Sequence, residues 1–194
     1  MFDFLREYIR SPFQIGAVAP SGRFLARRMM CPIDFDRARV IVEYGPGTGA
    51  FTKQLLSLKK DDTRLILIEQ NVRFYERVKA LCAKSPCTEV IFGSAADADR
   101  LLAERGIRHA DAVVSGLPFA SLSAETSRAV FAATRKLIGT DGIFITFQYT
   151  LWKRTFFEIA FHITENMFEW RNLPPAFVLV MRGRLIRCQT GENT

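Results

Sequence analysis

The stretch Val40-Ile41-Val42-Glu43-Tyr44-Gly45-Pro46-Gly47-Thr48-Gly49-Ala50 decides the fold of this chain. Its first half is β-branched and apolar, three glycines follow, and residues 51–56 (FTKQLL) have the spacing of a helix. Glycine lets the backbone turn tightly and approach a ligand closely, because it has no Cβ and reaches positive φ without strain. The stretch therefore predicts a strand, a ligand-binding turn and a helix in succession.

Two kinds of ligand are compatible with this turn. Gly45, Gly47 and Ala50 satisfy the dinucleotide fingerprint G-x-G-x-x-G/A, in which the helix N-terminus receives a pyrophosphate. Glu43, two positions before the first glycine, would repel a pyrophosphate but can hold an ammonium group directly or through water. With Gly49 the residues read E-x-G-x-G-x-G, which resembles motif I of the class I methyltransferases and favours S-adenosylmethionine (SAM). A purely structural glycine turn is the third alternative.

The resemblance to class I methyltransferases places a second cofactor contact at the end of the next strand. Glu69 ends the apolar run Arg64–Glu69, and its carboxylate is expected to accept both ribose hydroxyls, with Gln70 beside it. The alternative for Glu69 is a solvated charge at a strand end. The predicted contacts of these two strand ends are Glu43, Tyr44, Gly45, Pro46, Gly47, Thr48, Gly49, Glu69 and Gln70.

The loop after the third predicted strand, residues 92–97 (FGSAAD), occupies the place where class I methyltransferases recognise adenine. Those enzymes often use an aspartate there for the exocyclic amine and a backbone N–H for a ring nitrogen. Ser94 stands at the usual position of the aspartate. The adenine contact is therefore expected from Ser94, Ala95 or the later Asp97.

Apolar runs alternate with amphipathic stretches from about residue 38 onward, and no repeat or linker divides the chain. Alternating units of this kind form a parallel sheet with right-handed crossovers. Strands are predicted at 38–44, 64–69, 89–92, 112–115 and 143–147, with helices at 72–84, 99–105 and 123–137. Two more strands, 167–171 and 177–186, make an antiparallel hairpin. The predicted fold is α/β, a Rossmann-like class I methyltransferase with a mostly parallel seven-stranded sheet that ends in this hairpin and helices on both faces.

Length and composition indicate one globular domain. The chain has 194 residues, of which 48% are hydrophobic and 24% charged, enough to fill one core without disulfides or a metal. No apolar stretch reaches the ~18–20 residues of a membrane-spanning helix, and the N-terminus MFDFLREYIR lacks the regions of a secretory signal. Four cysteines without CxxC spacing and two histidines do not make a usual zinc site, so no metal is expected. The expectation is a cytoplasmic protein that associates peripherally with the inner membrane.

Charge and the N-terminal segment suggest an anionic partner. The chain has 27 lysines and arginines against 20 acidic residues, a net charge of +7, which suits a phosphate backbone or an anionic lipid surface. Within residues 1–10, apolar and charged side chains fall on opposite sides of a helix, which would let the segment lie in a membrane interface. The alternatives are an inert basic surface and a helix that packs on its own domain or on a partner. Residues 1–30 are therefore predicted to be an amphipathic segment that binds the membrane or covers the substrate, and residues 31–194 the methyltransferase domain.

The end of the fourth predicted strand is where amino-group methyltransferases hold the acceptor beside the sulfonium methyl. There a backbone carbonyl and often a side chain align the nitrogen, and positioning is most of the catalysis. The ribosomal RNA adenine dimethylases have N-L-P-Y or N-I-P-Y at this place, so Gly116 replaces an asparagine that would bond the base amine. The predicted acceptor-site residues are Ser115, Gly116, Leu117, Pro118 and Phe119, and Ser115 is also assigned to the cofactor.

Three segments resemble the bacterial phospholipid N-methyltransferase family, and the likeness runs from about residue 8 to residue 186. They are G-A-V-A-P-S at 16–21, S-G-L-P-F at 115–119 and N-L-P-P-A at 172–176. The resemblance implies that methyl groups are transferred to phosphatidylethanolamine, to its partly methylated forms, or to the amine of a related lipid such as an ornithine lipid. Methylation of N6 of RNA adenine and a non-catalytic module that binds SAM are the alternatives.

An amine accepts a methyl group only when its nitrogen is neutral, and the sequence offers no convincing general base. His109 precedes the fourth predicted strand and His162 is placed in a helix after the fifth, both as surface or packing residues. Tyr149 and Phe119 are candidates to stabilise the cationic acceptor through π contacts, with core packing as the equal alternative for both. Water can take the proton.

Overall fold

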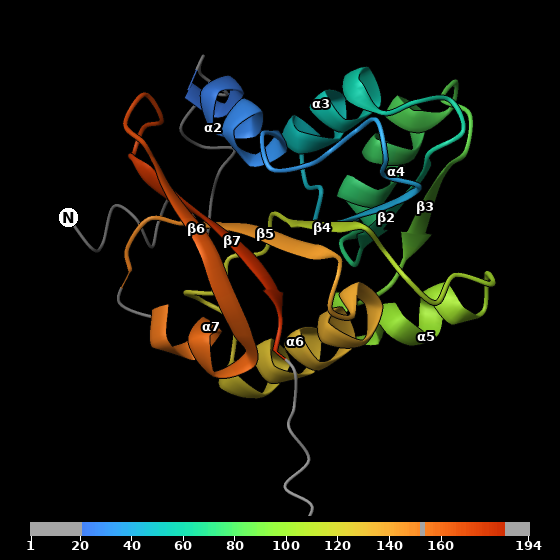
Figure 1. Cartoon of the computed structure of the whole chain (residues 1–194). Coiled ribbons are helices and arrows are strands. Elements are labelled where there is room, and N and C mark those ends of the chain that lie inside the picture. Colours follow the sequence, from blue (N-terminus) through green and yellow to red (C-terminus); the bar gives the residue numbers. More distant parts are fainter. Residues whose placement is uncertain (1–20, 152–153, 185–194) are drawn as a thin grey trace, which may run out of the picture.

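The sheet at the centre of the molecule has seven strands in the order β3-β2-β1-β4-β5-β7-β6 in the computed structural model, which describes residues 21–151 and 154–184 (Figure 1). β1 to β5 are parallel, and β7 pairs antiparallel with both β5 and β6. The predicted class I methyltransferase sheet and its terminal hairpin are confirmed. The strands are β1 Val40–Tyr44, β2 Arg64–Glu69, β3 Thr88–Phe92, β4 Ala112–Ser115, β5 Ile143–Gln148, β6 Phe161–Glu169 and β7 Ala176–Gly183.

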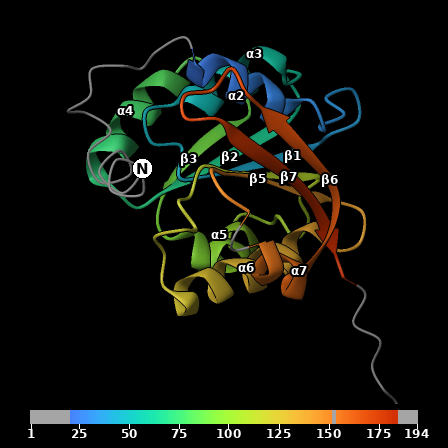
Figure 2. The same cartoon turned by 90° about the vertical axis from the view of Figure 1, so that its left-hand side faces the viewer.

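Helices cover both faces of this sheet, as the two views show (Figures 1 and 2). Neighbouring residues of a strand point to opposite faces, so Ile41 and Leu65 pack under α2, α3 and α4, whereas Val42 and Ile66 pack under α5, α6 and α7. The strands are therefore buried on both sides, which explains their continuous apolar runs. The helices are α2 Ser21–Met30, α3 Ala50–Leu58, α4 Val72–Cys82, α5 Ala98–Ala103, α6 Ala124–Ile138 and α7 Arg154–Ala160, with a 3-10 turn η1 at Ala95–Asp97.

The outer strand differs from its prediction. β6 begins at Phe161 instead of residue 167, so His162 lies in a strand and its predicted placement in a helix is wrong. β6 is an edge strand whose middle residues 164–166 are polar and exposed, and its register with β7 shifts between Ile163 and Glu165. The shift interrupts the alternation of apolar and polar residues by which a strand is recognised in a sequence.

α2 belongs to the same core as the sheet. Four of its side chains are buried against the face that α3 and α4 also cover: Leu25, Ala26, Met29 and Met30. Residues 1–20, which contain most of the predicted amphipathic segment, lie outside the described residues, and the division of the chain at residue 30 stays a prediction. Within the described ranges, no helix has both the length and the apolar character needed to cross a membrane.

A buried carboxylate ties α2 to the end of β6. Glu169 has no exposed surface, and its carboxylate accepts hydrogen bonds from Arg171 Nε at 2.9 Å and from Arg28 Nε of α2 at 3.3 Å. The bonds from Arg171 lower the pKa of Glu169 to about 2. The carboxylate therefore stays charged at neutral pH and joins the two arginines.

Glu169→Gln is expected to lower the free energy of unfolding by about 1–2 kcal/mol at neutral pH, because both arginines lose their anionic partner but remain partly hydrated. The folded-state pKa of Glu169 lies below its ordinary value of 4.5, so its contribution is present above pH 4.5 and is lost as the pH falls toward 2. Urea unfolding should therefore separate variant and wild type at neutral pH and bring them together in acid. Glu165→Gln, exposed on the same strand, is the matched control. Equal stabilities at neutral pH would contradict this role.

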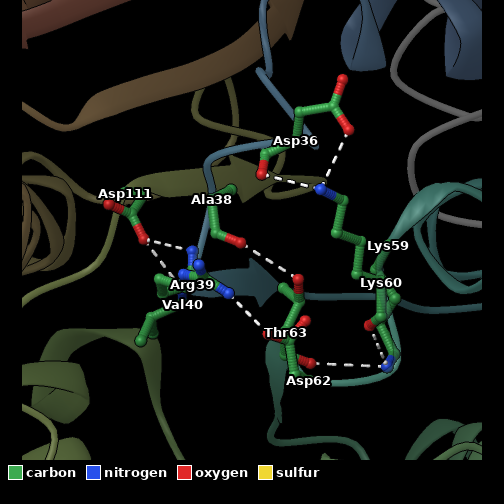
Figure 3. Close-up of polar contacts among 9 residues, drawn as sticks. All are labelled: Asp36, Ala38, Arg39, Val40, Lys59, Lys60, Asp62, Thr63 and Asp111. Atoms are coloured by element: carbon green, nitrogen blue, oxygen red, sulfur yellow. Dashed lines mark hydrogen bonds and ion pairs between the residues drawn. The ribbon is translucent and has the colours of Figure 1, made fainter.

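The amino ends of the strands are joined by polar contacts (Figure 3). Asp111 Oδ2 accepts the backbone N–H groups of Arg39 and Val40, each at 2.8 Å, and so connects β4 to β1. The Thr63 hydroxyl donates to the carbonyl oxygen of Ala38 at 3.0 Å and connects the start of β2 to the same segment. These hydrogen bonds tie the amino ends of β1, β2 and β4 together.

Candidate cofactor and acceptor site

The loops that follow β1, β2 and β4 meet at the carboxyl edge of the sheet. Gly45 N–H donates to Ile68 O at 3.0 Å, which links the ends of β1 and β2. Gly116 N–H donates to Tyr44 O at 2.8 Å, which links the ends of β4 and β1. The strand order reverses between β1 and β4, and open α/β sheets bind their ligands at such a point.

The glycine turn after β1 has a left-handed backbone. Gly45, Gly47 and Gly49 have φ angles of +60°, +54° and +84°, and α3 begins directly after them. Residues with a side chain rarely adopt such φ angles, so this turn requires glycine. Gly47 N–H donates to Oε2 of Glu69 at 3.1 Å. The turn is therefore held against the end of β2 by the carboxylate that the sequence assigns to the ribose.

Glu43 is a buried carboxyl group with one unsatisfied oxygen. It has no exposed surface, and its Oε2 accepts a hydrogen bond from Thr52 Oγ1 at 2.8 Å. Oε1 has no hydrogen-bond partner among the described residues, and burial raises the pKa of Glu43 to about 8. An unsatisfied buried oxygen is unfavourable by about 1–3 kcal/mol, so the position is suited to a cationic donor. Thr52, from the first turn of α3, is a site residue that the sequence analysis missed.

Glu69 is also buried. It is 5% exposed, so it is not the solvated strand-end charge that the sequence left as an alternative. Its Oε2 accepts from Gly47 N–H at 3.1 Å and its Oε1 from Asn71 N–H at 2.8 Å. Each carboxylate oxygen has a second lone pair, so two hydroxyl donors can still bind. Gln70 is exposed and lies, with Glu69, in the lining of the pocket described next.

A pocket opens beside Glu69 and the loop after β3. Ser94 and Ala95 line it, and Ser94 Oγ accepts the backbone N–H of Ala96 at 3.2 Å, which shapes the loop. Asp97 lies outside the lining and forms an ion pair with Arg100 at 3.8 Å, so Ser94 and Ala95 remain the candidates for adenine. The opposite wall comes from α6 and the loop before it, through residues that the sequence did not single out: Leu122, Thr126 and Val130.

The loop after β4 leaves no room for a side chain at position 116. A Cβ on Gly116 would lie 2.7 Å from the backbone oxygen of Gly45, which is too close for two non-bonded atoms. The asparagine of the RNA adenine dimethylases therefore does not fit this backbone. Ser115 is fully buried, and its Oγ accepts Leu117 N–H at 3.2 Å, which directs Leu117 to the pocket wall.

Two of the predicted site residues have core side chains. Phe119 is fully buried against three phenylalanine rings whose centroids lie 5.2 to 6.3 Å away, which favours the core-packing alternative over contact with the acceptor. Tyr44 is fully buried with its hydroxyl 3.4 Å from Thr134 Oγ1, and it reaches the site through its backbone. Tyr149 is half-buried and packs edge-on against Phe147 at 5.4 Å. Of the others, Pro46 is buried, Thr48 half-buried and Pro118 exposed.

Neither histidine lies at this edge. His109 precedes β4 and lies 3.9 Å from Asp111, in the loop that leads into the amino end of that strand. His162 is exposed at the amino end of β6, which is parallel to β5. Both are therefore at the edge opposite the pocket, and neither can take a proton from an acceptor bound there.

A curated relative matches nearly the whole of this chain. The ornithine lipid N-methyltransferase of Singulisphaera acidiphila is 34% identical over 188 residues, which are 94% of this chain and 95% of that protein. The chain belongs to the ornithine lipid N-methyltransferase family. It is a SAM-dependent methyltransferase, as predicted, so the dinucleotide and the non-catalytic interpretations are set aside. A scan against protein-family models finds no match.

Solved structures share the fold of this methyltransferase. The N-methyltransferase NodS from Bradyrhizobium japonicum WM9, in complex with S-adenosylhomocysteine (SAH), superposes with a TM-score of 0.70 at 13% identity and covers 89% of this chain and 92% of its own. The 1,6-didemethyltoxoflavin-N1-methyltransferase of Burkholderia thailandensis, also with SAH, gives 0.69 at 12% identity over 93% and 85%. Identities this low concern the fold alone.

Proposed function

We propose that this methyltransferase transfers methyl groups from SAM to the amine of a membrane lipid head group. The match to an ornithine lipid N-methyltransferase along nearly the whole chain carries the proposal. The amine of an ornithine lipid is therefore the first acceptor to test, and phosphatidylethanolamine with its methylated forms is the second. The net charge of +7 supports peripheral binding to an anionic lipid surface, which for a cytoplasmic enzyme is the inner membrane.

Two carboxyl groups would hold SAM in this site. The methionyl ammonium is the donor that Glu43 Oε1 would accept, directly or through water, although Glu43 itself does not line the pocket. The two ribose hydroxyls match the remaining lone pairs of Glu69, and adenine would lie between Ser94, Ala95 and the wall from α6. The chemistry of these donors and acceptors therefore fits the cofactor.

Glu43→Gln is expected to remove the pH dependence of SAH binding. The carboxyl group of ligand-free Glu43, with a pKa of about 8, is mostly protonated at neutral pH, whereas an ammonium partner favours the carboxylate. Binding should therefore release a proton, and affinity should rise from about pH 6 toward pH 8. Calorimetry in buffers of different ionisation enthalpy measures that proton, and the glutamine variant should release none. Binding to the wild type without proton release would contradict the role of Glu43.

The same pKa predicts how the ligand-free protein responds to pH. The folded-state pKa of Glu43 lies above its ordinary value of 4.5, so between pH 4.5 and about 8 the unfolded chain releases a proton that the folded protein keeps, and the free energy of unfolding falls as the pH rises. Glu43→Gln removes this loss. The variant should therefore show a flatter profile of unfolding free energy over that range.

The acceptor would be positioned chiefly by backbone. Bound SAM supplies an electrophilic methyl group on its sulfonium. The backbone of Ser115 and Gly116 lies at the switch point between β1 and β4, against the glycine turn, and is the element that would align the amine for in-line attack. Both histidines are at the opposite edge, so the proton of the amine would leave to water.

The lipids of cells that express the protein test this function. Mass spectrometry should detect ornithine lipid or phosphatidylethanolamine with added methyl groups, and the host strain alone should lack them. Cells with Glu69→Ala should contain the unmethylated lipids at the same level as the host. Unchanged lipids in cells with folded, SAH-binding wild-type protein would refute a lipid acceptor.

A further inference from the structure

Exposed apolar side chains gather at the edge that carries the cofactor site. Phe168, Trp170 and Leu173 are 49%, 69% and 76% exposed and lie at the turn between β6 and β7. β6 is antiparallel to β7 and β7 to β5, so this turn meets the same edge as the carboxyl ends of β1 to β5. These three side chains lie within six residues of one another, and a patch of this kind marks a binding surface. Val72 and Phe92 are also exposed, but they follow β2 and end β3, at the other end of the sheet. We call residues 168–173 the hairpin tip.

The hairpin tip is held in one shape by the groups beneath it. Glu169 accepts hydrogen bonds from Nε and Nη2 of Arg171 at 2.9 and 3.1 Å, and Arg28 of α2 binds the same carboxylate. The Arg171 guanidinium lies 4.4 Å from the ring centre of Phe24 and 5.9 Å from that of Trp170. Both views place the turn beside α2 (Figures 1 and 2). Trp170 and Leu173 are therefore presented to solvent on a fixed support.

The charge around the hairpin tip is positive. Glu169 is the one carboxylate of residues 168–173, and it is buried between Arg28 and Arg171, which leaves one excess positive charge. Arg23 and Arg27 are exposed on the same helix α2. Exposed tryptophan beside arginine is the combination that favours the head-group region of a bilayer with anionic lipids. An apolar partner protein would not need this charge.

We infer that the hairpin tip inserts into the head-group region of an anionic bilayer and thereby turns the cofactor edge toward the lipid amine. The inference rests on the proposed function, because a lipid acceptor has to be reached at the membrane surface. Phe24 of α2 packs against Arg171, so the described helix nearest the tip adds its exposed arginines to the same surface. The tip thus supplies an anchor within the folded domain.

Trp170 can report its own insertion. The chain has two tryptophans, so Trp152→Phe leaves Trp170 as the single fluorophore. Vesicles of phosphatidylcholine mixed with phosphatidylglycerol should shift its emission to the blue, and brominated acyl chains should quench it. Vesicles of phosphatidylcholine alone should do so much more weakly. Emission that stays unchanged while the protein sediments with the mixed vesicles would overturn the inference.

A double variant tests how much the tip contributes. Trp170→Ser with Leu173→Ser should lower the vesicle-bound fraction at limiting lipid by about tenfold, since two apolar side chains no longer leave water. Ile159→Ser, which changes a 71% exposed residue on α7, is the matched control and should bind like the wild type. Full vesicle binding by the double variant would overturn the inference. A double variant that binds vesicles like the wild type but no longer binds RNA would also overturn it, because the tip would then be an RNA-binding surface.

The inference and the proposed function fail separately in these measurements. SAH affinity of the double variant should equal that of the wild type, because the tip contributes no residue to the pocket lining. Methyl transfer to the lipid amine dispersed in detergent should also be retained, whereas transfer in vesicles should fall with binding. Vesicle binding through the tip without any lipid methylation would refute the proposed function and leave the docking surface intact. Methylation in vesicles that is insensitive to the double variant would refute the docking surface alone.

Discussion

Replacing Glu69 by alanine is expected to weaken SAH binding by about 100-fold or more, the equivalent of losing two hydrogen bonds to a charged group. The carboxylate accepts the N–H groups of Gly47 and Asn71, and its remaining lone pairs are the proposed partners of the ribose hydroxyls. Its removal therefore takes away ligand contacts and also releases the glycine turn. Calorimetric titration of the purified variant with SAH measures the loss.

A neighbouring carboxylate gives the control for Glu69. Glu76 is exposed on α4, and Glu76→Ala should bind SAH like the wild type. Glu69→Gln should have an intermediate effect, because one of its side-chain atoms still accepts a hydrogen bond. An affinity of Glu69→Ala equal to that of the wild type would contradict the ribose assignment.

Gly116→Ala is expected to lower the rate of methyl transfer by about 100-fold, because a small displacement of the backbone that positions the acceptor has an effect of this size. The new Cβ would lie 2.7 Å from Gly45 O. Because that oxygen belongs to the backbone, the clash is relieved only when the loops after β1 and β4 move apart. These loops hold the glycine turn and the proposed acceptor position, so both SAH binding and turnover should suffer. The rate of labelled methyl transfer from SAM to lipid at saturating SAM measures the effect on turnover.

Gly22 provides the matched control for this substitution. A Cβ at Gly22 meets nothing within 4 Å, so Gly22→Ala should keep the wild-type rate. Gly116→Asn restores the asparagine of the RNA adenine dimethylases, and it should lose lipid methylation without gaining RNA methylation. Wild-type turnover by Gly116→Ala would show that the close approach of the two loops is not needed.

Buried parallel strands were predictable because their pattern is strong. β2 and β4 have the bounds expected from the sequence, since each is a short apolar run between turn residues. β6 was not recognised over its full length, because its centre is polar and the shift at Ile163 and Glu165 breaks its alternation. Edge strands with one solvated face carry too few apolar residues to be distinguished from loops or helices by periodicity.

The candidate site was predictable where backbone requirements determine the residue type. The glycines of the turn and the carboxylates at the ends of β1 and β2 follow from chemistry that few other residues can supply. For Phe119 the sequence left both roles open, because a phenylalanine next to a predicted site has the same sequence signal whether it faces the ligand or the core. The wall from α6, with Leu122 and Thr126, carries no signal of its own, since the helix pattern already explains its apolar residues by packing.

The most direct test is transfer of a deuterated methyl group from labelled SAM by the purified protein to vesicles that contain ornithine lipid or phosphatidylethanolamine, with ribosomal RNA as a separate acceptor. Tandem mass spectrometry should locate the label on the head-group nitrogen of a lipid, with no label on RNA and none anywhere for Glu69→Ala. Label on RNA adenine, or on no acceptor although SAM is bound, would contradict the function proposed for this edge of the sheet.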